Sequence, residues 1–340
     1  MEHLGLLGLS DSGHAALFAA LTGQDATTAS ERLLGVVAIP DERLARLAAM
    51  SESKQVVPAT LQLAYLPGLS TEAGKGLGSR LLGSVRDCDA LMLVVRADDG
   101  HDAAKELTAL EEELILADLG SVEGRVAKQR RAAKGDKSLA AEVAALERAE
   151  AALSDGNPIY RAELTDDERA LLGPAFLLTN KPALVVVNVG VDQLDGADAL
   201  ASPFGEDALA VCLELEGDPD VVAAQGEERA QLLADLGIPE SVVPRLARSA
   251  LHLLGRDTFL TTGDKESRAW TFRAGSTAPE CAGVIHSDLQ RGFIRAEVID
   301  WKEVLELGSW TKAKEAGALR VEGKDYVVRD GDVLEIRFNV

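Results

Sequence analysis

Near the start of the chain, two glycines at the spacing of a phosphate-binding loop are the residues with the clearest chemical potential. Residues 8–15 read Gly-Leu-Ser-Asp-Ser-Gly-His-Ala and lie between an apolar run and an apolar helical stretch. This is the context of the motif G-x-x-x-x-G-K-[ST], whose backbone N–H groups surround a phosphate at a helix N-terminus. The spacing predicts a nucleotide pocket lined by Gly8, Ser10, Asp11, Ser12 and Gly13.

Two side chains that this motif needs are replaced. His14 stands where a lysine reaches the β- and γ-phosphates, and Ala15 stands where a hydroxyl holds Mg²⁺. A charge-assisted hydrogen bond contributes about 1.5–3 kcal/mol, so loss of the lysine alone lowers the affinity about 10- to 150-fold. An unperturbed histidine is mostly neutral near pH 7. We therefore expect ATP or GTP with Mg²⁺ as a cofactor only if the altered pocket still binds it.

Other patterns in the sequence offer no second chemistry. The glycine cluster at 74–78 lacks the spacing and the hydroxyl of a phosphate loop, and the histidines show no metal-ligand spacing. The cysteines at positions 88, 212 and 281 are scattered and form no C-x-x-C pair. This usage fits a reducing cytosol better than a secreted disulfide scaffold. No catalytic residue and no metal ligand is assigned, and the expected location is cytoplasmic.

Strand-like and helix-like stretches alternate around the loop. Residues 4–8 predict a buried strand and residues 15–21 a helix, while the apolar runs 61–66, 90–95 and 183–189 suit buried parallel strands. This alternation predicts an α/β fold with a parallel sheet that is covered by helices on both faces.

Between the last two of these strands, the composition changes to that of long helices. Residues 103–154 contain no proline, and leucines recur at helical spacing on both sides of a Lys-Gly-Asp turn at 134–136. We therefore expect an antiparallel helical hairpin inserted into the α/β domain. A basic cluster lies near its tip: Lys128, Arg130, Arg131, Lys134 and Lys137. A solvated helix end and a contact with a polyanion are equally weighted interpretations of this cluster.

The C-terminal part of the chain changes again, to short strands with alternating polar and apolar residues. Residues 267–273 and 332–338 show this alternation, and the Arg-Asp-Gly-Asp turn at 329–332 overlaps the start of the second run. The three textures predict a loop-bearing α/β domain of residues 1–100 and 176–255, a helical insertion of residues 101–175, and a small α+β domain of residues 256–340.

The charge of the chain is strongly negative and unevenly distributed. The formal net charge is −21, and from residue 190 to residue 240 the chain has 13 acidic residues against one arginine. Such a charge disfavours non-specific attraction to nucleic acid, so DNA is not an expected partner and any RNA contact must come from a local basic patch. No apolar run approaches the roughly 18 residues of a spanning helix, so no membrane partner is expected.

Several segments identify a family. The C-terminal part contains TAPECAGVIHSD at 277–288, RGFIRAE at 291–297, AKEAG at 313–317 and EGKDY at 322–326, and the hairpin contains AKGDK at 133–137. These segments resemble the TGS domain and the helical segment of the YchF family. YchF proteins are Obg-related P-loop nucleotide hydrolases with a G domain, a coiled-coil hairpin and a TGS domain, which prefer ATP to GTP and associate with ribosomes. The resemblance therefore implies this architecture, with the ribosome or another RNA-containing assembly as partner.

The resemblance also makes further departures visible, besides the two replaced residues of the loop. The family motif D-x-x-G, whose aspartate serves the Mg²⁺ region, keeps Gly68 but has Tyr65 in place of the aspartate. The base-recognition motif N-x-x-E keeps Asn188 and has Val191 in place of the glutamate. By contrast, the glycine cluster at 74–78 matches the switch II stretch of the family. The losses point in one direction, toward a G domain that is retained as a scaffold with a degraded nucleotide site.

Three functions are compatible with this sequence. The first is a pseudo-NTPase, a translation-associated adaptor that docks through its TGS domain and the hairpin tip without Mg²⁺-dependent turnover. The second is an active but atypical YchF-type ATPase or GTPase, in which His14 and Asp192 replace the lost groups. The third is a module that binds nucleotide through the loop backbone alone and performs no chemistry.

Overall fold

The computed structural model describes residues 3–69, 79–98, 100–224 and 226–339. The chain forms two compact units, one of Met1–Val36 and Gln62–Leu246 and the other of Val37–Leu61 and Ala247–Val340. The glycine cluster at 74–78, predicted to match a switch II stretch, lies outside the described residues. No helix in the described ranges combines the length and the apolar character that crossing a membrane requires.

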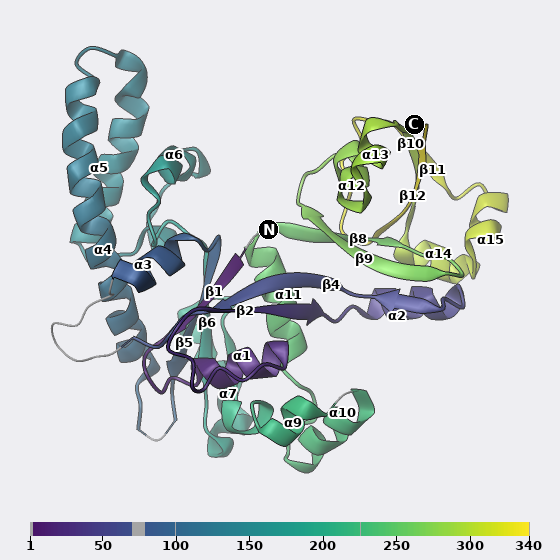
Figure 1. Cartoon of the computed structure of the whole chain (residues 1–340), viewed down its shortest axis with the longest axis horizontal. Helices are drawn as coiled ribbons and strands as arrows, with labels where there is room; N and C mark the ends of the chain where they lie inside the picture. Colours follow the sequence, from purple (N-terminus) through teal and green to yellow (C-terminus); the bar gives the residue numbers. More distant parts are fainter. Residues whose placement is uncertain (1–2, 70–78, 99, 225, 340) are drawn as a thin grey trace. The chain divides into compact units, whose positions relative to one another are not determined.

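The first unit is built on a six-stranded sheet (Figure 1). In spatial order its strands are β2 (Leu33–Ile39), β4 (Ala59–Tyr65), β1 (His3–Gly8), β5 (Ala90–Arg96), β6 (Ala183–Asn188) and β7 (Leu209–Val211). From β4 to β7 all neighbouring strands pair in parallel. The predicted α/β fold with a parallel sheet is confirmed, and each predicted strand of this sheet is present within two residues of its expected ends.

Both faces of this sheet are covered. Every residue from Ala90 to Val95 in β5 is completely buried, which requires cover above and below the strand. One of the covering helices, α1 (His14–Thr22), begins directly after the loop that follows β1. Two other helices of the unit are α3 (Ser79–Arg86) and α6 (Asp166–Leu172).

A long helical hairpin follows the C-terminal end of β5. Helix α4 (Ala103–Ala132) and helix α5 (Ala140–Ser154) run side by side and are joined by a turn and the short 3₁₀ helix η1 (Lys137–Leu139) (Figure 1). The first turns of α4 bury Leu107, Leu110 and Leu114 against the sheet, and the later turns pack on α5. The hairpin predicted from leucine spacing is therefore confirmed.

The acidic segment from residue 190 to residue 240 is folded as short elements. It contains the strand β7 and several helices of no more than ten residues. These helices are η4 (Val191–Gly196), α7 (Ala197–Ala201), η5 (Ser202–Phe204), α8 (Leu213–Glu216), α9 (Pro219–Ala223) and α10 (Gly226–Asp235), and α11 (Val243–Leu253) follows.

The second unit contains the other six-stranded sheet. In spatial order its strands are β11 (Arg320–Glu322), β10 (Phe293–Asp300), β12 (Asp332–Phe338), β8 (Arg256–Thr261), β9 (Glu266–Arg273) and β3 (Gln55–Val57). Its helices are α2 (Glu42–Met50), α12 (Ala278–Ile285), α13 (Ser287–Arg291), α14 (Trp301–Leu307) and α15 (Trp310–Glu315). A core that includes Phe259, Phe272 and Val298 lies between this sheet and α12. The predicted C-terminal α+β fold is confirmed.

Residues 37–61 belong to this second unit, although the sequence texture grouped them with the first strands. The physical reason is backbone pairing, because β3 forms a parallel pair with β9 in which Gln55 faces Glu266 and Val57 faces Arg268. Lys54 also donates its backbone N–H to the carbonyl of Asp264, over a distance of 3.1 Å. The three-domain division inferred from sequence texture stays a prediction.

One buried carboxylate ties the hairpin to the segment that returns to the sheet. Asp118, on α4, is 1% exposed and accepts hydrogen bonds from Leu178 N (2.8 Å), Thr179 N (2.7 Å) and Thr179 Oγ1 (2.7 Å). Burial raises the pKa of Asp118, and these three donors oppose that rise. The carboxylate therefore satisfies backbone groups just before β6 begins.

We expect Asp118→Ala to lower the free energy of unfolding by about 3 kcal/mol, because three buried donors lose a charged acceptor. Asp118→Asn keeps one acceptor oxygen and should lose less. The measurement is urea unfolding followed by far-UV circular dichroism. Glu123→Ala, at an exposed position of the same helix, serves as the control and should change stability by less than about 0.5 kcal/mol. An equal, small effect of both alanine variants would contradict this role for Asp118.

Candidate functional site

The loop between β1 and α1 has the backbone of a tight turn, and its glycines are required by that turn. Gly13 adopts φ +87°, and a Cβ atom there would also lie 2.7 Å from Asn188 Nδ2. A Cβ atom on Gly8 would lie 2.1 Å from Ser12 Oγ. Asp11 also has a positive φ, of 67°, and its side chain is exposed. Both glycines are thus explained by packing and backbone conformation, without reference to a phosphate.

Two backbone donors of the loop are already bonded within the protein. Ser10 N donates to the carbonyl of Leu69 at 2.8 Å, and Ser12 N donates to the carbonyl of Leu9 at 3.1 Å. Leu69 N in turn donates to the carbonyl of Gly8 at 2.9 Å. The first N–H groups of α1 have no carbonyl one turn earlier in the helix, so they remain the loop's potential anion donors.

The histidine at the lysine position is buried and neutral. His14 is 4% exposed, and its Nδ1 lies 2.9 Å from the hydroxyl of Ser12, which is completely buried. Its Nε2 has no hydrogen-bond partner among the described residues. Burial lowers the pKa of His14 to about 4, and the backbone of Leu66 and the Asp11 carboxylate oppose this only in part. At neutral pH this imidazole therefore supplies no positive charge to the loop.

The ring of His14 lies flat against Tyr65, at the end of β4. The two ring centroids are 5.1 Å apart with an interplanar angle of 7°. Phe18 of α1 packs on the Tyr65 ring, with the two ring centroids 5.7 Å apart. Burial raises the pKa of Tyr65. Gly68 completes the contact, because a Cβ atom there would lie 3.0 Å from His14 Cε1. These residues form an apolar aromatic cluster beside the phosphate loop.

Asn188, at the end of β6, joins the loop to the segment after β7. Its Nδ2 donates to the carbonyl of Ser12 at 3.3 Å, and its Oδ1 accepts from Leu213 N at 3.1 Å. Both ends of the buried amide are therefore used by the backbone of neighbouring loops. Val191 and Asp192, three and four residues further along, are exposed at the start of η4.

These side chains do not match the donor set that a Mg²⁺-bound nucleotide needs. Ala15 has no oxygen for a metal, His14 is a neutral group turned against Tyr65, and Asp11 adds an exposed negative charge to the loop. Within the described ranges, no three histidine, cysteine, aspartate or glutamate side chains gather as metal ligands. The loop can offer a phosphate only the partial charge of a helix N-terminus.

The structure brings together the pocket residues that the sequence singled out. Gly68 and Asn188, which are distant in sequence from the loop, both lie against it. In the sequence, Tyr65 is visible only as the loss of an aspartate, and nothing in it indicates the contact with His14. Sequence reasoning also missed Phe18 and Leu213, because apolar residues in an apolar context carry no signal of a site.

The basic cluster lies at the end of the hairpin, away from the loop. All five of its residues are exposed, and Arg130 pairs with Glu147 of α5 at 2.6 Å. The other four, Lys128, Arg131, Lys134 and Lys137, form no ion pair with a described residue. The tip therefore presents four unpaired basic side chains to solvent, with the exposed carboxylate of Asp136 in the same turn, so its charge is positive overall.

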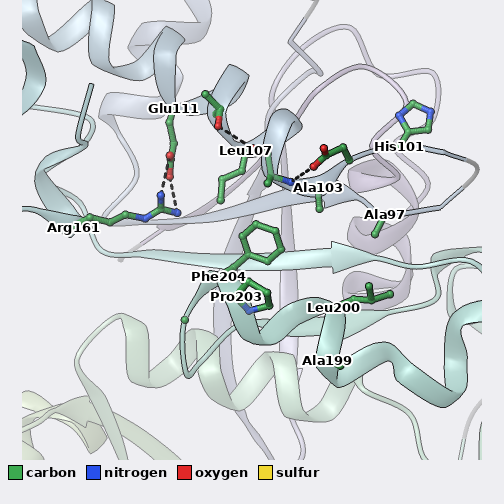
Figure 2. Close-up of a pocket in the computed structure, with 14 residues that line it drawn as sticks. Ala97, His101, Ala103, Leu107, Glu111, Arg161, Ala199, Leu200, Pro203 and Phe204 are labelled. Atoms are coloured by element: carbon green, nitrogen blue, oxygen red, sulfur yellow. Dashed lines mark hydrogen bonds and ion pairs between the residues drawn. The ribbon is translucent and has the colours of Figure 1, made fainter. Parts of the chain in front are cut away.

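A cavity of about 1040 Å³ lies elsewhere in the first unit. Figure 2 shows one wall made by the first turns of α4, with Ala103 and Leu107, and the facing wall made by Leu200 and Phe204. The sequence carries no local signal of this cavity, because its walls come from residues 97–111 and 199–205, which are far apart in the chain.

The C-terminal part of the chain matches a known family model. Residues 257–339 match YchF-GTPase_C, described as a protein of unknown function (DUF933).

Curated relatives match over the whole length. The ribosome-binding ATPase YchF of Bacillus subtilis is 38% identical over 363 residues, which cover 99% of each chain. The protein of the same name from Haemophilus influenzae is 37% identical over 360 residues, again 99% of each chain.

A solved structure shows the same fold. The structure of the Schizosaccharomyces pombe YchF GTPase aligns with a TM-score of 0.84 and 24% sequence identity, covering 99% of this chain and 97% of that chain. With relatives this similar over essentially its full length, the chain belongs to the YchF family.

Proposed function

We propose that this YchF-family protein acts by docking on the ribosome and that its phosphate loop is a structural element without Mg²⁺-dependent nucleotide hydrolysis. The observation that carries the second part is the stack of His14 on Tyr65. The two positions correspond to the lysine and the metal-side aspartate of the family motifs. A pair of opposite charges that serves a nucleotide is thus replaced by a neutral pair of packed rings.

Support for ribosome docking comes from the relatives, which are named ribosome-binding and cover 99% of this chain. In this proposal the G domain, residues 1–100 and 176–255, serves as a scaffold. The helical insertion, residues 101–175, and the TGS domain, residues 256–340, supply the docking surfaces. A ribosomal partner supports a cytoplasmic location for the protein.

The same names also contain the word ATPase, and the site residues argue against that activity here. Loss of the lysine removes a charge-assisted hydrogen bond worth about 1.5–3 kcal/mol. The imidazole does not replace it, because burial lowers the pKa of His14 to about 4. Mg²⁺ lacks two groups of the family motifs, because Ala15 stands in place of the hydroxyl and Tyr65 in place of the aspartate. Restoring one of them alone would therefore not rebuild the metal site.

The alternative, an active but atypical ATPase or GTPase, was suggested by the loop glycines and by Asn188. Each has a structural role that persists without nucleotide, because Gly8 makes room for Ser12 and the Asn188 amide links two loops. Asp192 is exposed in the first turn of a 3₁₀ helix. These features therefore do not favour catalysis over a scaffold.

The hairpin tip is the docking surface that the charges single out. A phosphate backbone attracts clustered lysine and arginine side chains, and this attraction weakens as salt rises. Four of the five basic residues at the tip form no ion pair with a described residue, whereas Arg130 pairs with Glu147. In a chain with a net charge of −21, such a patch is the feature most suited to ribosomal RNA.

Calorimetric titration of the purified protein with ATP and with GTP, in the presence of Mg²⁺ at near-physiological salt, should give no binding heat up to millimolar nucleotide. The triple variant His14→Lys, Ala15→Ser, Tyr65→Asp, checked for folding by circular dichroism, should bind at least 10-fold more tightly, since the charged groups return. Micromolar binding by the unmodified protein would overturn the scaffold proposal on its own and make the atypical enzyme the better interpretation.

Burial of neutral His14 should make the fold sensitive to acid. Its pKa falls from 6.5 to about 4 on folding, so its contribution to stability is complete above pH 6.5 and is lost as the pH falls toward 4. The loss reaches about 3 kcal/mol. His14→Phe keeps a ring against Tyr65 and should remove this part of the pH dependence, measured by urea unfolding at pH 7 and at pH 4.5. His252→Gln, at an exposed position, is the control; identical pH profiles for His14→Phe and the unmodified protein would show that His14 is not buried as a neutral group.

Reversal of the tip charges should weaken ribosome binding. We expect Arg131→Glu combined with Lys134→Glu to reduce co-sedimentation with ribosomes at least 10-fold at physiological salt, since each reversal replaces an attraction to phosphate by a repulsion. Lys105→Glu, in the first turn of the same helix α4, reverses one charge at the other end of the helix; it is the control for position and should co-sediment normally. Unchanged co-sedimentation of the double variant would remove the tip from the docking surface and leave the TGS domain as the candidate.

A further inference from the structure

The cavity beside α4 has the form of a short groove. Along one wall, α4 contributes Ala103, Ala104, Leu107, Thr108 and Glu111, which lie at helical spacing on one face. From the first to the last of these positions the helix rises about 12 Å. This length corresponds to about two turns of a second helix laid alongside.

The facing wall is made of small and apolar residues at the end of α7 and in η5. It comprises Ala199, Leu200, Pro203, Phe204 and Gly205, and Leu200 is 36% exposed. Figure 2 shows Leu107 and Phe204 on opposite walls and Ala97 at one end. Ala103 and Leu107 are buried in the core and form the floor of the groove. Ala104, Ala199 and Leu200 are exposed, so they are the apolar surface that the groove offers to a ligand.

The polar residues at the ends of the groove are already paired. Arg161 contacts Glu111 through both carboxylate oxygens, at 2.9 and 3.0 Å, and the Tyr160 hydroxyl also donates to this carboxylate. At the other end, Asp102 caps α4 and pairs with Lys105 at 3.3 Å. These groups therefore frame the groove without adding net charge to it.

The net charge comes from the residues that follow the groove wall. Glu206 and Asp207, next to Gly205 in the chain, are exposed and form no ion pair with a described residue. They belong to the segment 190–240, with 13 acidic residues against one arginine. An apolar groove beside such a field suits a ligand with apolar anchors and positive charges around them, and it repels nucleic acid.

We propose that this groove binds a short amphipathic helix of a partner protein, with two or three apolar anchors at helical spacing and lysine or arginine on its flanks. The apolar anchors fill the space between Leu107 and Leu200, and the flanking cations face the acidic segment. Helix-in-groove recognition uses anchors at i, i+3 or i+4 and i+7, which matches the two-turn length of the wall. This inference does not depend on whether the phosphate loop binds nucleotide.

Fluorescence anisotropy with the full-length protein tests the proposal. The probe is a labelled 14-residue peptide of leucine, lysine and alanine, with three leucines on one helical face. A scrambled peptide of the same composition and a peptide with glutamate in place of lysine are the comparisons. We expect the amphipathic peptide to bind at least 10-fold more tightly than the scrambled one, and the acidic peptide not to bind. Equal affinity for the amphipathic and scrambled peptides would overturn the proposal, since charge alone would then explain the binding.

Variants of the two walls locate the binding. Ala104→Arg on α4 and Ala199→Arg on α7 each place a long cationic side chain in the groove from an exposed position, so the fold should tolerate both. Each should lower the affinity for the amphipathic peptide at least 10-fold. Ala234→Arg, exposed in the same acidic segment but away from the groove, adds the same charge and should have less than a threefold effect. Equal effects of the three variants would place the peptide outside the groove and contradict the proposal.

Discussion

The stack of His14 on Tyr65 is the contact around which the phosphate loop of the first unit is packed. It is stable only while the imidazole is neutral, because a charged ring at 4% exposure would lose its hydration without a partner for Nε2. The Ser12 hydroxyl, Gly8 and Gly68 all pack around this arrangement. Any ligand that needs a positive charge at position 14 must therefore first break the stack.

The fold was predictable because its signals are local. Strands β1, β5 and β6 are short apolar runs, and burial on both faces of a parallel sheet requires such runs. The hairpin was visible from leucines at helical spacing, although Ala145 and Ala149 share its seam with Leu146 and Leu153. The placement of residues 37–61 was not predictable, because it depends on the pairing of β3 with β9 across 200 residues of chain.

The candidate site was only half predictable for the same reason. Glycine spacing located the loop, and the family motifs brought Gly68 and Asn188 to it. The contact between His14 and Tyr65 arises because β1 and β4 are parallel neighbours, with Leu6 opposite Tyr65 in register. The register between two strands cannot be inferred from either strand alone. In the sequence, Tyr65 is only the loss of an aspartate, whereas in the structure it is one member of a packed pair with His14.

Helix α4 separates two surfaces of opposite character. Its first turns, up to Glu111, form a wall of the groove, and the basic cluster lies around its C-terminal end. The helix ends at Ala132, 21 residues after Glu111. At 1.5 Å per residue these surfaces are about 30 Å apart, whereas electrostatic interactions are screened over about 8 Å at physiological salt. The negative charge beside the groove therefore does not cancel the positive potential at the tip. A strongly acidic chain can in this way carry a basic surface and an acidic surface on one helix, each with its own electrostatic potential.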